Sequence, residues 1–182
     1  MMERFVLARN NRGTIASMIT LLLSNLIIQP VILADELPKE SVLSLGVANK
    51  AIQAALEACK KDGYRVSVSV VDRAGVLRAM GRADGAGPHT VESSRKKAYT
   101  AASVRRPTSE LADLITKIPS LQSLRDMNGD ILILGGGLPI EIGGEVVGGI
   151  GVGGAPGTHL DDACAQDGLD AIGAAPKVPT PK

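Results

Sequence analysis

The stretch GGGLPIEIGGEVVGGIGVGG, residues 135–154, predicts a β-hairpin. Two runs of alternating apolar residues flank the dipeptide Gly143-Gly144. A Gly-Gly pair is a favoured two-residue hairpin turn, because both positions of that turn need positive φ. We therefore expect two antiparallel strands joined by this turn, in the C-terminal part of the domain.

The same region contains the string Gly149-x-Gly151-x-x-Gly154, which has the spacing of a dinucleotide-binding loop. Such a loop requires a helix to begin within the glycine motif. Here Gly149 and Gly151 fall inside the second strand of the predicted hairpin, and the Ala-Pro-Gly segment at 155–157 delays any helix. We therefore reject a phosphate-binding loop. Glycines inside a strand indicate instead that another backbone or a ligand approaches closely.

Hydrophobic periodicity predicts the other elements. Apolar residues at steps of three and four from Val42 to Cys59 predict an amphipathic helix that stops at Gly63. The alternating segment 65–72 predicts a half-buried strand, with 76–82 as its hairpin partner. We expect further helices over 91–104, 109–117 and 159–175, and another strand at ILIL, residues 131–134. This order predicts one α+β domain with a five-stranded antiparallel sheet.

The N-terminus has the pattern of a secretory signal. Three arginines precede a mostly apolar run at 14–34, and an acidic segment follows Ala34. The run is also long enough to act as an uncleaved anchor, but its polar residues make a poor membrane helix, so we favour cleavage. The predicted parts are a signal peptide over 1–34, a domain over 35–175 and a loose tail over 176–182. We expect a periplasmic or secreted protein without stable membrane insertion.

Composition limits the partners and the core. The formal net charge of +1 and the aromatic content of 2% provide neither a basic stripe nor stacking platforms, so we expect no nucleic-acid partner. The two cysteines, Cys59 and Cys164, leave two alternatives. Either they are small buried residues on helix faces, which we favour, or they form one disulfide in an oxidising compartment.

Several motifs together resemble one known family. They are VSVVDRAGVLRAMGRADGA at 68–86, KKAYTAAS at 96–103, GGGLPIEIGGEVVGGIGVGGAPG at 135–157 and DDACAQDGLDAI at 161–172. In this order they resemble the GlcG/HbpS-like heme-binding proteins. The resemblance implies a profilin-like three-layer α/β/α fold and a homo-oligomer with sites where subunits meet. It also implies binding of heme or a related tetrapyrrole, in the sensing or buffering of extracellular heme and iron.

In at least one branch of that family the axial ligand is a histidine on the first helix, where this chain has none. The candidates are therefore the two histidines of the chain. His89 lies in a loop before a helix and is the main candidate for the heme-iron ligand, since loops present ligands on a rigid frame. His159, at the start of the last helix, is the weaker candidate. The alternative for both is a solvent-facing or capping role.

Charged and small residues complete the predicted site. Arg82 and Lys97 can neutralise heme propionates, or instead form ion pairs with Asp84 or Glu92. Thr90 offers a hydroxyl near the pocket, although helix capping also explains it. In the heme hypothesis, Gly149 and Gly151 leave room for a flat ligand.

Two further functions remain open at this stage, and no residue is assigned a catalytic role. One is an enzyme or accessory protein for a small carboxylate such as a 2-hydroxy acid, in which Arg82 and Lys97 clamp the substrate and His89 or Asp84 moves a proton. The other is a structural oligomer whose loops only mediate subunit contact. The sequence has no nucleophile with an adjacent base, so we consider an enzyme the less favoured reading.

Overall fold

A computed structural model describes residue 37 and residues 39–174 of the chain. The chain divides into two units, Met1–Lys39 and Glu40–Lys182, and the elements below all belong to the second unit. The predicted signal peptide and the predicted tail lie outside the described residues. Across the described part of the chain, no helix has both the length and the apolar character needed to cross a membrane.

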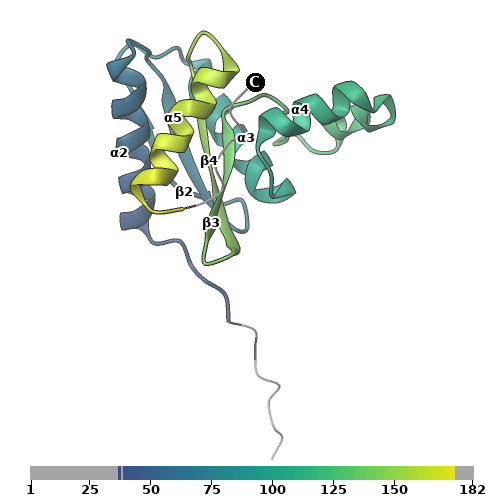
Figure 1. The fold of residues 1–182 in the computed structure, drawn as a ribbon, viewed down its shortest axis with the longest axis horizontal. Coiled ribbons are helices and arrows are strands. Elements are labelled where there is room, and N and C mark those ends of the chain that lie inside the picture. Colours follow the sequence, from purple (N-terminus) through teal and green to yellow (C-terminus); the bar gives the residue numbers. More distant parts are fainter. Residues whose placement is uncertain (1–36, 38, 175–182) are drawn as a thin grey trace, which may run out of the picture. The chain divides into compact units, whose positions relative to one another are not determined.

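The fold is α+β, with one antiparallel sheet of four strands in the order β2-β1-β4-β3 (Figure 1). The strands are β1 (Ser67–Asp72), β2 (Leu77–Arg82), β3 (Gly137–Ile142) and β4 (Glu145–Gly153). The predicted hairpin is confirmed: β3 and β4 pair across Gly143 and Gly144, whose φ angles are 62° and 81°. Both glycines therefore adopt the positive φ that this turn requires.

The fifth predicted strand, at residues 131–134, is wrong, because within the described residues this segment is irregular and joins no sheet. Its apolar side chains are buried in another way. Ile133 packs with Leu111 and Ile115 of a neighbouring helix, and the backbone N–H of Leu132 donates to the hydroxyl of Thr100 at 2.8 Å. A short apolar run can bury itself against helices without pairing as a strand, and periodicity does not distinguish the two.

The first strand is buried on both faces, where the sequence predicted a half-buried strand. Its valines at 68 and 70 point into the main core. The opposite face carries Ser67 and Ser69, which are fully buried and bond to hydroxyls of a covering helix. A serine that alternates with apolar residues predicts a solvent-facing position in a strand. A serine hydroxyl can nevertheless be buried when it forms a hydrogen bond with another hydroxyl, as both serines do here.

Helices cover both faces of the sheet. They are α2 (Leu45–Lys61), α3 (His89–Val104), α4 (Thr108–Lys117) and α5 (Thr158–Ala171), with a 3-10 helix η1 (Pro119–Asp126) after α4. Figure 1 shows α2 and α5 side by side on one face, and α3 lies on the other. The predicted helices are thus confirmed with small shifts at their ends. The likeness to profilin itself stays a prediction.

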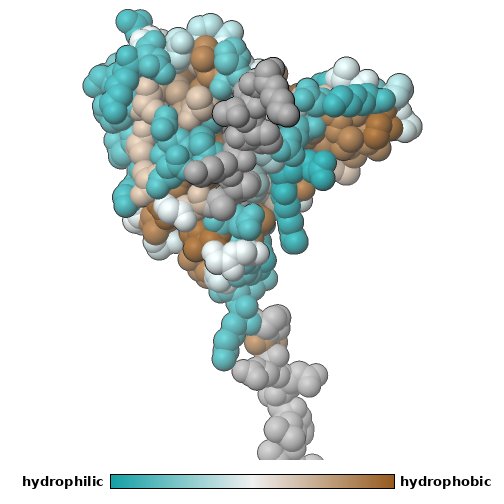
Figure 2. All heavy atoms as spheres, viewed as in Figure 1, coloured by the Kyte–Doolittle hydropathy of each residue, from teal (hydrophilic) through white to brown (hydrophobic). Residues whose placement is uncertain are grey.

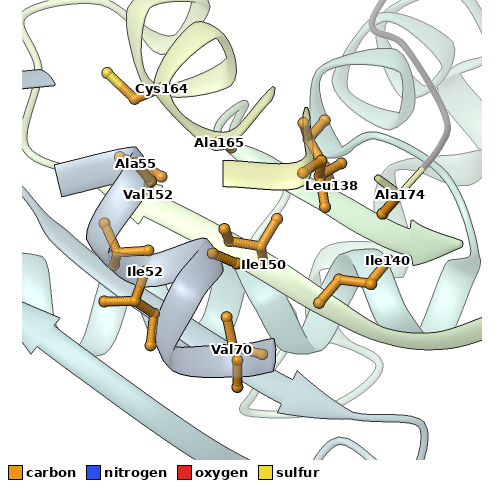
Figure 3. Packing of buried hydrophobic residues seen from close by; sticks show 14 of the residues in the cluster. Ile52, Ala55, Val70, Leu138, Ile140, Ile150, Val152, Cys164, Ala165 and Ala174 are labelled. Carbon is orange, nitrogen blue, oxygen red and sulfur yellow. The ribbon is translucent and has the colours of Figure 1, made fainter. Parts of the chain in front are cut away.

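The main core lies between the sheet and the pair α2 and α5 (Figure 3). It is built from aliphatic side chains, including Ile52, Val70, Leu138 and Ile150, as the near absence of aromatic residues requires. Gly168 of α5 lets this helix approach α2, since a Cβ there would lie 2.8 Å from the carbonyl oxygen of Ala51. The core is therefore tightly packed with small residues.

The two cysteines form a disulfide in this core, so the alternative that we favoured, two free buried thiols, is wrong. Cys59 of α2 and Cys164 of α5 are joined, with their Cα atoms 5.5 Å apart. Both side chains are buried. The bond therefore ties together the two helices that cover one face of the sheet.

The segment formed by α4 and η1 is named here the α4–η1 arm, and it has a small core of its own. Leu111 and Ile115 are buried there with Ile133. Other apolar side chains of this region are exposed, including Ile118 and Met127. Figure 2 shows apolar residues gathered along the arm. Exposed apolar patches of this kind mark surfaces for contact with other molecules.

Candidate functional site

The candidate site lies at the end of the sheet where α3 and α5 begin. Ser67, the first residue of β1, pairs with Arg82 of β2 and with Gly153 of β4, so the loops leading into both helices leave the sheet at this end. The two loops adjoin: a Cβ on Gly154 would lie 2.7 Å from the carbonyl oxygen of Arg65 and 3.2 Å from the methyl group of Thr90. The predicted loop residues therefore share one end of the molecule.

His89 is the first residue of α3 and its side chain is exposed. Its imidazole lies over Gly87, where an added Cβ would be 2.7 Å from Cε1 of the ring. His159, the second residue of α5, is also exposed and lies over Gly157 in the same way, at 2.7 Å. Each histidine thus presents its ring to solvent at a helix start, above a glycine that leaves space for it.

Thr90 is buried and holds the start of α3 against the sheet. Its hydroxyl lies 2.7 Å from the hydroxyl of Ser67 and donates to the carbonyl oxygen of Gly87 at 2.6 Å. The sequence allowed Thr90 to be the N-cap of this helix. In the structure Pro88 occupies the N-cap position, and Thr90 lies within the helix. Thr90 fixes the position of His89 and contributes no exposed hydroxyl.

Arg82 is exposed at the end of β2 and holds the loop before α3. Its Nε donates to the carbonyl oxygen of Ala86 at 3.0 Å, and one of its terminal nitrogens donates to the same oxygen. The loop itself turns through a bond from the N–H of Ala86 to the carbonyl oxygen of Ala83 at 3.0 Å. The structure therefore brings Arg82 and His89 to opposite ends of one ordered loop, residues 83–88, named here the Arg82 loop.

Lys97 lies elsewhere, inside the protein. Its side chain is 2% exposed, and its ammonium group donates to Oδ2 of Asp161 at 2.7 Å and to the carbonyl oxygen of Val152 at 2.9 Å. The predicted alternative partners, Asp84 and Glu92, are wrong for Lys97, because Asp161 of α5 takes this place. Lys97 therefore links α3, β4 and α5 from within, and does not share a surface with Arg82.

The acidic pair Asp161 and Asp162, near the start of α5, is buried. Asp161 pairs with Lys97 and accepts from the N–H of Ala155 at 3.0 Å. Asp162 accepts from the N–H of Gly136 at 2.6 Å, and burial raises the pKa of Asp162 above its ordinary value. The sequence signal for this cluster was weak, because its members are far apart in the chain.

Gly149 and Gly151 serve the packing of α3 on β4. A Cβ on Gly149 would overlap the carbonyl oxygen of Ala98, and one on Gly151 would overlap that of Ser94 and lie 2.5 Å from the N–H nitrogen of Ala98. The close approach that strand glycines predict is therefore made by another backbone. Within one chain, the space facing these two glycines is filled by α3.

Comparison with known proteins identifies the family of this chain. The family model described as "Haem degrading protein HbpS-like" matches residues 43–170. The chain belongs to this HbpS-like family, as its motifs predicted.

Three relatives illustrate the likeness. A crystal structure of a double mutant of HbpS from Streptomyces reticuli is 44% identical and superposes with a TM-score of 0.70, over 75% of this chain and 91% of that one. A crystal structure of a PduOC:heme complex is 29% identical with a TM-score of 0.69, over 74% and 98%. Protein GlcG of Escherichia coli strain K12 is 32% identical over 118 residues, 61% of this chain and 81% of the relative.

The described residues restrict how a metal ion can be held. Among them, no three histidine, cysteine, aspartate or glutamate side chains come together as a set for a metal ion. The first helix of the described part, α2, contains no histidine.

Proposed function

We propose that this protein binds heme or a related tetrapyrrole at the surface formed by Arg82, the Arg82 loop and His89. The observation that carries the proposal is that one ordered loop has an exposed guanidinium at its start and an exposed imidazole at its end, in a chain whose relative PduOC has been crystallised with heme. A bound heme would supply an iron centre, and the imidazole of His89 is the side chain that would ligate it.

The other predicted residues have supporting roles in this proposal. Thr90 fixes the start of α3 and hence the position of His89. The packing of α3 against the sheet depends on Gly149, Gly151 and Lys97, which lie inside the protein. His159, exposed on the adjoining loop, is a second candidate ligand, either in the same chain or toward a neighbouring subunit.

The proposal includes export and self-association. A disulfide is typical of oxidising compartments, so the bond between Cys59 and Cys164 supports a periplasmic or secreted domain, with cleavage after Ala34. The exposed apolar residues in and next to the α4–η1 arm, Ile118 and Met127, support a homo-oligomer. In this setting the protein senses or buffers heme outside the cytoplasm.

Hemin titration tests the proposed function. The full chain is titrated with hemin while absorbance in the Soret region is recorded, and we expect a saturable, sharp band. Absence of any saturable change would contradict heme binding. A band that forms and then decays would indicate heme breakdown, the activity in the description of the family.

A second candidate function is an enzyme or accessory protein that acts on a small carboxylate. It is favoured by the exposed guanidinium of Arg82, which forms no ion pair among the described residues. A ligand that binds only the native state raises its stability. Small carboxylates such as glycolate should then raise the melting temperature in the absence of heme.

A further inference from the structure

We propose that Arg65 and Arg82 together form a carboxylate-binding site on the Arg82 loop. The inference deepens the proposed function, on which it rests for the case in which the carboxylates are heme propionates. It replaces the predicted pair of Arg82 and Lys97, since Lys97 is buried with Asp161.

The two guanidinium groups contact consecutive residues of the loop. Arg65, in the segment before β1, lies over Gly85: a Cβ on this glycine would be 3.2 Å from Cδ and 3.3 Å from Nη1 of Arg65. Arg82 is bonded to the carbonyl oxygen of the next residue, Ala86. Two cationic groups therefore lie beside neighbouring positions of one short loop, and both residues are exposed.

Neither arginine is neutralised within the part of the chain that the structure describes. No ion pair joins Arg65 or Arg82 to a carboxylate there, and Arg65 donates no hydrogen bond. Asp84, in the same loop, is exposed and pairs with neither of them, while Glu92 of α3 is paired with Arg95. An anion that binds beside this loop is therefore attracted by two guanidinium groups that have no carboxylate partner there.

The loop that the two arginines contact is ordered by its own turn. Gly85 has a φ of 79°, which places it in the left-handed region that favours glycine, and the turn closes through Ala83 and Ala86. The side chain of Ala86 is buried, so the loop is anchored to the protein body. A rigid loop loses little conformational entropy on binding, which favours affinity for a small ligand.

Carboxylate is the ligand chemistry that this arrangement fits. A guanidinium group presents parallel N–H donors that match the two oxygens of a carboxylate. Arg65 has all its donors available, and Arg82 keeps those not used for Ala86. The carboxylates have two sources, the propionates of heme or a free small acid, and the experiment below separates them.

The test compares Arg65→Gln with Lys50→Gln, a matched control that removes the same charge from an exposed position on α2. Three probes are used on the full chain. Hemin and hemin dimethyl ester, in which both propionates are blocked, are followed by absorbance in the Soret region. Succinate binding is measured as the shift in melting temperature. We expect Arg65→Gln to weaken hemin binding about tenfold, since a hydrogen bond to a charged group is strong. Binding of the dimethyl ester should be unchanged by this variant, and Arg65→Lys should recover part of the loss.

The outcomes separate this inference from the proposed function. If the wild type binds no hemin but succinate raises its melting temperature, and Arg65→Gln abolishes that rise, the heme proposal fails and the carboxylate site stands. If Arg65→Gln matches Lys50→Gln with both hemin and succinate, the carboxylate site is overturned, whether or not heme binds. Since Arg65 is exposed and donates no hydrogen bond, the variant is expected to fold normally.

Discussion

At the scale of single residues, the glycines of β4 determine how closely α3 approaches the sheet. Gly151 faces the backbone of α3 at Ser94 and Ala98, so even a methyl group has no space there. The same glycines first suggested a nucleotide loop and then a space for a ligand. Their role in helix packing follows from the partner backbone, which the sequence around them does not reveal.

Gly151→Ala should therefore destabilise the protein by about 3 kcal/mol, because overpacking a tight interface forces the backbone to shift. Gly129→Ala is the matched control, since nothing lies within 4 Å of a Cβ at that position. Urea denaturation measures both variants. Equal stability of the two would contradict the packing role of Gly151.

The buried pair of Lys97 and Asp161 should be costly to break from one side. Lys97→Met leaves the carboxylate of Asp161 buried without its cation, and such a loss typically costs about 3–5 kcal/mol. Lys97→Met with Asp161→Asn removes both charges and should cost less than the sum of the single variants. Additive losses in a double-mutant cycle would show that the pair is not coupled.

The raised pKa of Asp162 predicts a pH dependence of stability. Because burial raises this pKa in the folded state above its ordinary value of 3.8, the folded protein holds the proton more tightly than the unfolded chain does. The protonated Asp162 therefore stabilises the folded protein at low pH, and this stabilisation is lost as pH rises through the raised pKa. The Asp162→Asn side chain cannot titrate, so the free energy of unfolding of this variant should improve relative to that of the wild type from pH 4 to pH 8. Urea denaturation at both pH values measures this. The same difference in free energy at the two pH values would refute the prediction.

At the scale of elements, local signals predicted more than long-range ones. The β3–β4 hairpin was predictable because Gly143 and Gly144 encode their own turn. The run at 131–134 was mispredicted because its burial depends on Leu111 and Ile115, which are distant in sequence. The burial of β1 on both faces likewise depends on hydroxyl partners in α3.

The pairing of α2 with α5 depends partly on the disulfide between Cys59 and Cys164. These residues are 105 positions apart, and on the chain-entropy model a bond that closes so long a loop in the unfolded chain stabilises the folded protein by about 4.7 kcal/mol. The double variant Cys59→Ala with Cys164→Ala should lose about that much stability, measured by urea denaturation. Reductant should destabilise the wild type similarly and leave the double variant unchanged; a wild type insensitive to full reduction would contradict the estimate.

At the scale of the whole domain, two loops meet at the end of the sheet from which α3 and α5 start. His89, His159 and Arg82 were predictable as candidates because loops before helices are identifiable in the sequence. The buried position of Lys97 could not be predicted from the sequence, because its partner Asp161 lies 64 residues away in the chain. The contact of Arg65 with the Arg82 loop was also hidden, since it arises only when β1 and β2 pair.

His89 is the proposed ligand of the heme iron, and one titration tests this role most directly. Hemin is added to the wild type, to His89→Ala and to His159→Ala, which is the matched control because it removes the other exposed imidazole at a helix start. We predict a sharp, saturable Soret band in the wild type and in His159→Ala, and its loss or broadening in His89→Ala. An unchanged band in His89→Ala would contradict ligation by His89, and absence of a band in the wild type would contradict heme binding.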